Sequence, residues 1–369
     1  MKQRDFMAVI SGERRGAGAS LLRFVLRLLS FWFWLAAITR LAMYRIGLLR
    51  AIKVDKPVIC VGNLTTGGTG KTPAVARVVQ MLQELGLKPW IVSRGYKSET
   101  AGNDEMKVLE ELCPGVPHIQ NPDRVAGATK AIHDGAEVIV LDDGFSHLRL
   151  KRDLDILLFD ALNPFGYARM LPRGLLREPV RSVRRAKFAI FSRAGVAHVD
   201  RLRDLEDTIR CNGFVGGIAH AAHSPVKLVR VSNGEDAPLE TLAGAVVAPF
   251  CGIGNPRGFE RTLEKLGAKL TPLGALQMDD HQDYGEREIE RQVIPFLRMT
   301  RETGATIGVC TQKDAVKFRG ADIETEAGMP VYELRIEFRI IKNEEALAEA
   351  LKMAVHGEEE EKETRPEPA

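Results

Sequence analysis

The sequence predicts an α/β fold in which helices flank a mostly parallel β-sheet, with a second, smaller α/β domain toward the C-terminus. Residues 58–72 indicate a buried strand, a glycine-rich loop and the start of a helix. Residues 137–143 indicate another buried strand, which ends in two aspartates. A change of composition near residues 222–245 marks the start of the second domain.

The composition is that of an ordinary globular protein with an uneven charge distribution. The 369 residues are 45% hydrophobic and 27% charged, so two domains with sizeable cores are expected. Net charge is +3, yet residues 1–56 hold eleven Lys and Arg against three Asp and Glu. The five cysteines are scattered without a CxxC pair, which indicates reduced thiols in a cytosolic setting and argues against a zinc site or a disulfide framework.

A basic, aromatic helix is predicted near the N-terminus. We expect residues 1–17 to be a flexible basic segment and residues 18–50 to form one long helix. Its uncharged core, Leu28 to Thr39, is shorter than the roughly 20 residues that span a bilayer. Arginines flank a core that contains Phe31 to Trp34, which is typical of a helix lying in a membrane interface on the cytoplasmic face. A signal peptide and a helix packed on the protein's own core remain alternatives.

The stretch VICVGNLTTGGTGKT, residues 58–72, has the form of a P-loop and indicates a P-loop NTPase-like sheet. Glycines let backbone N–H groups surround phosphate oxygens, and the following helix adds its positive end. Lys71 is expected to reach the β- and γ-phosphates and the Thr72 hydroxyl to hold Mg²⁺. The first glycine of the usual motif is replaced here by Thr65. The predicted nucleotide-binding residues are Thr65, Thr66, Gly67, Gly68, Thr69, Gly70, Lys71 and Thr72.

The strand EVIVLDD has the form of a Walker B motif. An acid at the carboxyl end of a parallel strand faces the nucleotide crevice, so Asp142 and Asp143 are predicted to bind Mg²⁺ directly or through water. The alternative is a strand–turn junction with Asp–Gly turn chemistry.

Charged residues mark two further segments. Asp104 and Glu105 begin a predicted helix, where an acid also serves as a cap. A long loop after residue 160 is rich in arginine, and Arg169, Arg173 and Arg177 are candidates to hold phosphate. A solvated basic face is expected for the remaining loop arginines, Arg181, Arg184 and Arg185.

The C-terminal region starts with an alternating strand at 225–231, and the alternating run 330–340 is expected to pair with it. The last residues are rich in Glu and Pro and need not fold. The predicted organisation is a flexible N-terminus (1–17), a membrane-interface helix (18–50), a P-loop domain (51–224), linker strands with a C-terminal α/β domain (225–355) and a disordered acidic tail (356–369).

Together these motifs predict a nucleoside triphosphate, Mg²⁺ and an anionic or lipid acceptor at a membrane surface. A GTPase is one alternative, because TQKD at 311–314 resembles a guanine-reading motif. A membrane-bound positioning ATPase is another, although it needs a lysine where Thr66 stands. We expect a monomer with no nucleic-acid partner.

Several motifs in order resemble the tetraacyldisaccharide 4′-kinase family, which acts in lipid A biosynthesis. They are GGTGKTP (67–73), SRGY (93–96), DE (104–105), DDGFSH (142–147), LREP (176–179), GIGNP (252–256), DH (280–281) with Tyr284, and TQKDAVKF (311–318). The resemblance implies ATP-dependent phosphorylation of the 4′-hydroxyl of a tetraacylated glucosamine disaccharide 1-phosphate. It also implies a membrane-associated N-terminal helix at the inner membrane and two α/β domains joined by a two-stranded linker.

The resemblance also assigns roles to residues. Lys71 and Thr72 match the residues that serve the phosphates and Mg²⁺, and Asp142 and Asp143 match the Walker B acids. Asp104 matches a catalytic acid and His281 the histidine that pairs with it. An Asp–His pair offers a sugar hydroxyl a base near neutral pH. The remaining active-site matches are Glu105, Arg124, Arg177 and Glu178.

Overall fold

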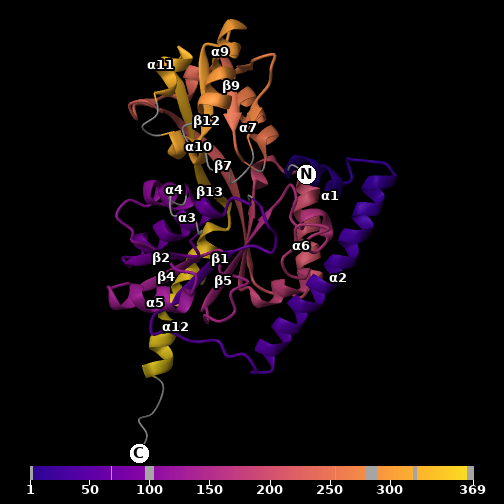
Figure 1. The fold of residues 1–369 in the computed structure, drawn as a ribbon. Helices are drawn as coiled ribbons and strands as arrows, with labels where there is room; N and C mark the ends of the chain where they lie inside the picture. Colours follow the sequence, from indigo (N-terminus) through magenta and orange to yellow (C-terminus); the bar gives the residue numbers. More distant parts are fainter. Residues whose placement is uncertain are drawn as a thin grey trace, which may run out of the picture. The chain divides into compact units, whose positions relative to one another are not determined.

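The chain divides into two compact units. The structure, a computed structural model, describes residues 3–67, 69–95, 104–253, 255–278, 289–318 and 322–363. The ribbon in Figure 1 shows the elements by their labels. Unit 1 contains Met1–Lys97, Leu109–His223 and Phe338–Ala369, and unit 2 contains Ser98–Val108 and Ser224–Glu337.

A parallel sheet forms the centre of unit 1 and carries the expected phosphate-binding loop. Its strands follow the order β7-β6-β5-β1-β4-β2-β3, and the ladders between them are parallel. This confirms the predicted mostly parallel α/β sheet. The strands are β1 (Val58–Gly62), β2 (Pro89–Ser93), β3 (His118–Gln120), β4 (Val138–Asp142), β5 (Leu154–Asp160), β6 (Phe188–Ser192) and β7 (Gly217–Arg230).

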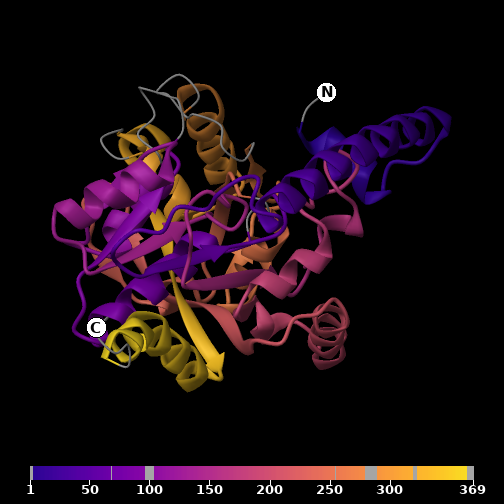
Figure 2. The ribbon, with the colours of Figure 1, turned by 90° about the horizontal axis from the view of Figure 1, so that it is seen from below.

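Helices cover both faces of this sheet, as Figure 2 shows from below. Because side chains alternate along a strand, Ile59 and Val61 of β1 lie in one core and Val58 and Cys60 in the other. The first core is covered by α3 (Lys71–Glu84) and α12 (Glu344–Glu363), and the second by α5 (Arg124–His133) and α6 (Val199–Cys211). Burial on both faces explains why these strands are continuous apolar runs.

The strands of unit 2 have neighbours in the order β10-β9-β12-β13-β7. The ladders of β9 with β10 and of β12 with β9 and β13 are parallel. Strands β7 and β13 each have residues in both units. The elements are β8 (Asp236–Ala237), β9 (Val246–Cys251), β10 (Lys269–Leu270), β11 (Leu276–Gln277), β12 (Ile307–Thr311), β13 (Val331–Lys342), α7 (Pro256–Lys265), α9 (Ile294–Glu302), α10 (Gln312–Phe318) and α11 (Ile323–Ala327).

The C-terminal region differs from the expectation in two ways. Leu347 and Leu351 of α12 are fully buried in the core beside β1, so this helix belongs to unit 1 rather than to the C-terminal domain. The helix also continues to Glu363, although residues 356–369 were expected to be a disordered acidic tail. Glu and Lys are good helix formers, which explains how an acidic run extends a helix that is already anchored.

The N-terminal region also differs. Residues 1–17 were expected to be flexible, yet α1 (Gln3–Ser11) forms a helix and buries Val9 and Ile10. The apolar residues between Phe6 and Ile10 were the overlooked signal. The long helix α2 (Ala17–Arg45) forms within the expected range and projects from unit 1 with α1 (Figure 2). Only Leu26 and Ser30 of α2 are buried, so the helix does not pack into a core of the protein.

Candidate active site

The loop between β1 and α3 forms a backbone cradle at the carboxyl end of the sheet. Gly67 and Gly70 have φ angles of +104° and +85°, a left-handed region that favours glycine. A Cβ atom on Gly70 would lie only 2.7 Å from Nε2 of His223, so a side chain has no room there. Gly70 caps α3 without a side-chain hydrogen bond. Because no side chain caps the positive end of α3 at Gly70, the N–H groups there can bind an anion.

Distant segments hold this cradle in shape. The amide N–H of Thr66 donates to the Leu175 carbonyl (2.8 Å), and that of Arg177 donates to the Leu64 carbonyl (2.8 Å). On the other side, the hydroxyl of Ser192 at the end of β6 donates to the Thr69 carbonyl (2.9 Å). These contacts fix the loop to the arginine-rich segment and to the neighbouring strand.

Asn63, directly after β1, joins the cradle to two cations. Its side chain is fully buried, and its Nδ2 donates to Thr69 Oγ1 (3.1 Å) and Thr65 Oγ1 (3.3 Å). Its Oδ1 accepts from Lys71 Nζ (3.4 Å) and from the Arg177 guanidinium. Asn63 was not among the predicted site residues. Its signal was the position of a polar residue at the carboxyl end of a buried strand, where ligand sites gather.

The Walker B aspartates meet Arg177 at the same edge. Asp143, with φ of +54°, donates its N–H to the Val61 carbonyl (3.0 Å). Arg177 donates to both carboxylate oxygens of Asp143, at 2.8 and 2.6 Å. Burial raises the pKa of the Asp143 carboxyl, but Lys71 and then Arg177 outweigh it, so the pKa lies below its ordinary value. The carboxylate is therefore ionised at neutral pH.

The predicted metal ligands suit Mg²⁺ by their chemistry. In the described part of the chain, no group of three or more His, Cys, Asp or Glu side chains is arranged to hold a metal. Mg²⁺ does not need one, because it is usually held by one or two carboxylates together with substrate phosphates and water. Thr72 is the second residue of α3, and Asp142 ends β4. Both oxygens of Asp143 accept hydrogen bonds from Arg177.

Arg124 belongs to the same electrostatic group. It is 6% exposed, donates to the Pro122 carbonyl (3.3 Å), and its Nε has no hydrogen-bond partner among the described residues. Burial and then the charge of Arg94 lower its pKa, while Asp143 and Asp142 act in the opposite direction. A buried cation near the Walker B acids is suited to stabilise phosphate charge.

The buried Glu178 and the partly buried Arg185 form an ion pair next to Arg177 in sequence. Arg185 donates to the Glu178 carboxylate (2.6 Å), and its guanidinium carbon lies 4.1 Å from the centroid of the Phe145 ring. Glu178 is 5% exposed. The expectation that Arg185 is a solvated surface cation is therefore wrong, because an aromatic face and a carboxylate draw it inward. Arg181 and Arg184 are exposed, as expected.

Four predicted residues cannot be placed by their side chains. Asp104 begins α4 (Asp104–Leu112) and Glu105 follows it, but only their backbone is described. Gly68 and His281 lie outside the described residues. The roles of these residues stay predictions.

A buried histidine next to the cradle predicts a pH dependence of stability. Burial, followed by the charge of Arg193, lowers the pKa of His223 to about 4. Between an unfolded pKa of 6.5 and this value, the unfolded chain binds a proton that the folded chain excludes. The free energy of unfolding is expected to fall as the pH is lowered through this window.

Denaturant titrations at several pH values across that window give the slope of the free energy of unfolding against pH. His223→Gln is expected to reduce this slope by the equivalent of up to about one bound proton. The exposed His133 supplies the comparison, and His133→Gln should change the slope less than His223→Gln does. Equal slopes for both variants would contradict a neutral, buried His223.

A family profile and two curated relatives of this chain carry the same description. A family profile described as tetraacyldisaccharide-1-P 4′-kinase (LpxK) matches residues 22–356. A tetraacyldisaccharide 4′-kinase of Halothermothrix orenii is 34% identical over 363 residues, covering 90% of this chain and 93% of the relative. One from Anaeromyxobacter dehalogenans strain 2CP-C is 36% identical over 357 residues, covering 92% of each. The crystal structure of LpxK from Aquifex aeolicus in complex with ATP superposes with a TM-score of 0.67 at 27% identity, covering 90% of this chain and 99% of that one.

Proposed function

The chain belongs to the tetraacyldisaccharide-1-P 4′-kinase family, and from this premise we propose how its residues carry out the family's reaction. The activity is ATP-dependent transfer of a phosphoryl group to a hydroxyl of a lipid A disaccharide precursor. The observation that carries the assignment to this site is the arrangement around Asn63. It holds Lys71 and Arg177 beside the glycine-rich loop.

The cradle and its cations provide positioning and charge stabilisation. The N–H groups at the start of α3 bind phosphate oxygens, and Lys71 moves its ammonium from Asn63 to the β- and γ-phosphates when ATP is present. Arg124 adds positive charge where the transferred group gains negative charge. Thr72 and Asp142 would hold Mg²⁺, which would supply positive charge to offset that of the phosphates. Arg177 keeps Asp143 ionised and the loop in place.

We propose that Asp104 accepts the proton of the sugar hydroxyl and that His281 pairs with Asp104. Both assignments rest on the resemblance of the sequence motifs. Asp104→Ala and His281→Ala are each expected to lower kcat about a hundredfold, because a general base typically contributes that much. ATP affinity should remain near that of the wild type. Loss of ATP binding in either variant would show that the pair supports the nucleotide site rather than proton transfer.

The helix α2 is proposed to hold the enzyme on the cytoplasmic face of the inner membrane. By length and composition alone it is apolar enough to cross a bilayer. Its middle, however, is attached to unit 1, because the Ser30 hydroxyl donates to the Met170 carbonyl (2.9 Å) and Arg40 donates to the Ser146 carbonyl (3.1 Å). One side thus contacts protein and the other exposes aromatic residues. This arrangement supports a helix that lies in the interface.

The function is tested by incubating the protein with radiolabelled ATP and a tetraacyldisaccharide 1-phosphate, followed by chromatography of the lipid. Label is expected in a bisphosphorylated lipid. Unlabelled ATP should suppress this transfer and GTP should not. Suppression of the transfer by GTP but not by ATP would favour the GTPase. Release of free phosphate without labelled lipid would favour the positioning ATPase.

A further inference from the structure

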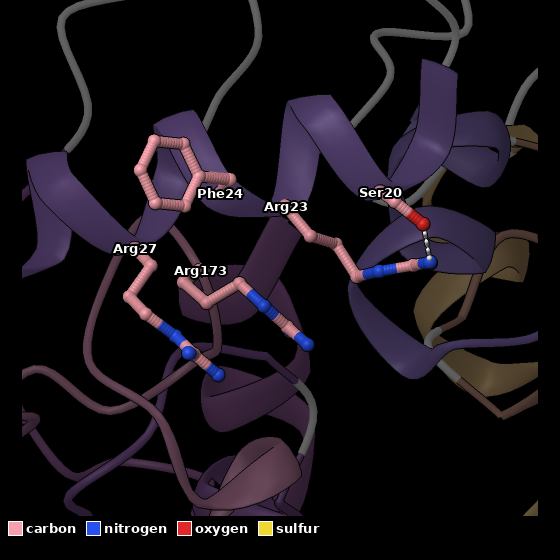
Figure 3. Close-up of a pocket in the computed structure, with 5 residues that line it drawn as sticks. All are labelled: Ser20, Arg23, Phe24, Arg27 and Arg173. Carbon is pink, nitrogen blue, oxygen red and sulfur yellow. Dashed lines mark hydrogen bonds between the residues drawn. The ribbon is translucent and has the colours of Figure 1, made fainter. Parts of the chain in front are cut away.

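Three arginines meet in a groove that the proposed reaction does not use. Arg23 and Arg27 of α2 and Arg173 of the arginine-rich segment line it with Ser20 and Phe24, around a volume of 220 Å³ (Figure 3). All five residues belong to unit 1. In the close-up, the Arg27 and Arg173 side chains lie beside each other below the helix.

Neutral oxygen atoms hold these cations in place. Arg23 donates to the Arg14 carbonyl (2.8 Å) and to the Ser20 hydroxyl (3.1 Å), and Arg173 donates to the Ile10 carbonyl (2.8 Å). In the part of the chain that the structure describes, none of the three arginines forms an ion pair with a carboxylate. Burial lowers the pKa of Arg173, and the nearby Arg23, Arg169 and Arg27 lower it further. The groove therefore concentrates positive charge that no carboxylate among the described residues neutralises by an ion pair.

An apolar stripe runs beside these arginines. Phe24, Leu28 and Trp32 follow one another at four-residue spacing on α2 and are 57%, 53% and 66% exposed. Such a stripe lies at the boundary of headgroups and acyl chains when a helix binds a bilayer. The guanidinium groups of Arg23 and Arg27 then lie at the depth of lipid phosphates.

We propose that the groove formed by Arg23, Arg27 and Arg173 binds the phosphate of an anionic phospholipid of the membrane surface, as a site separate from the nucleotide cradle. Guanidinium groups match phosphate oxygens in geometry as well as in charge. Carbonyl oxygens already orient two of the three, so little side-chain freedom is lost on binding. The proposal rests on the membrane location proposed for α2, but it does not depend on the kinase assignment.

The test is flotation of the full chain with vesicles, without nucleotide. Vesicles of phosphatidylcholine are compared with vesicles that also contain phosphatidylglycerol, and with vesicles given equal charge by oleate, which has no phosphate. The wild type is expected to bind the phosphatidylglycerol vesicles most tightly. Each arginine near an anionic surface is worth about a fivefold change in partitioning, so Arg23→Gln/Arg27→Gln/Arg173→Gln should weaken binding about a hundredfold.

A matched triple variant controls for net charge. Arg181, Arg184 and Arg201 are exposed arginines of unit 1 outside the groove, and changing all three to glutamine should weaken binding only a few-fold. The single variant Arg27→Gln, at an exposed position, should give about a fivefold loss and guards against misfolding of the triple variant, which thermal unfolding monitors.

Three outcomes would overturn the proposal. One is an equal loss of binding in the two triple variants. Another is that the arginine substitutions weaken binding to oleate vesicles as much as binding to phosphatidylglycerol vesicles. This would indicate that the groove recognises negative charge but not phosphate. The third is arginine dependence only when the vesicles are also given the tetraacyldisaccharide 1-phosphate. The kinase assignment is judged separately by phosphate transfer, so the two can fail independently.

Discussion

Replacing Lys71 with alanine is expected to lower kcat for phosphate transfer by at least about a thousandfold. Lys71 follows the cradle directly, and its ammonium lies 3.4 Å from Asn63 Oδ1, next to the Walker B acids. Phosphoryl transfer leaves little covalent chemistry to the protein, so the charge placed on the β- and γ-phosphates carries much of the catalysis. No other lysine stands in the cradle sequence from Thr65 to Thr72.

The measurement is the rate of label transfer from ATP to the lipid acceptor at saturating concentrations of both. Lys88 provides a control, because its side chain is exposed and Lys88→Ala removes the same charge outside the cradle. A Lys71→Ala rate within tenfold of the Lys88→Ala rate would remove the phosphate-site assignment. Lys71→Arg is expected to remain strongly impaired, since a planar guanidinium does not replace a compact ammonium.

Arg177→Ala is expected to lower the free energy of unfolding by about 3 kcal/mol and to weaken ATP binding at the same time. Arg177 makes two hydrogen bonds to Asp143 and donates to both the carbonyl and the Oδ1 of Asn63. Its loss removes the partner of a carboxylate that is 35% exposed and one of the two cationic donors to a buried amide oxygen. The backbone of the cradle, which pairs with this segment at Leu64, is loosened as well.

Urea denaturation and nucleotide titration measure the two effects. Arg181, four residues further along the same segment, is exposed, so Arg181→Ala should change neither value beyond the usual range of surface substitutions. Adding Asp143→Asn to Arg177→Ala should recover part of the lost stability, because the uncompensated charge disappears. Additive losses in this double-mutant cycle would contradict a direct pair.

Much of the fold could be predicted because its signals are local. The strands β1, β4, β5 and β6 are apolar runs bounded by loops, and the helix after Gly70 shows its start and its buried face in sequence. The return of α12 to unit 1 could not be predicted in this way. An amphipathic helix shows that it has an apolar face, but not which sheet that face covers.

The candidate site divides in the same manner. Gly70, Lys71 and Thr72 were predicted from spacing alone, because a P-loop is built within one short segment. The place of Asn63 at the centre of the site depends on Arg177, 114 positions away. The ion pair of Arg185 with Glu178 shows the same limit. The sequence gives the charge of each residue but does not identify the residue that it contacts.

By itself, the sequence determined the phosphate cradle, the strand that carries the Walker B acids and the aromatic helix near the N-terminus. These are properties of short segments, fixed by glycine conformations, strand burial and residue spacing. Only the tertiary structure decided which cation joins Asp143 and Asn63, and which arginines meet beside α2. Such contacts join residues far apart in the chain. Their free energy comes from desolvated charges and hydrogen bonds that exist only once the sheet and its loops have packed.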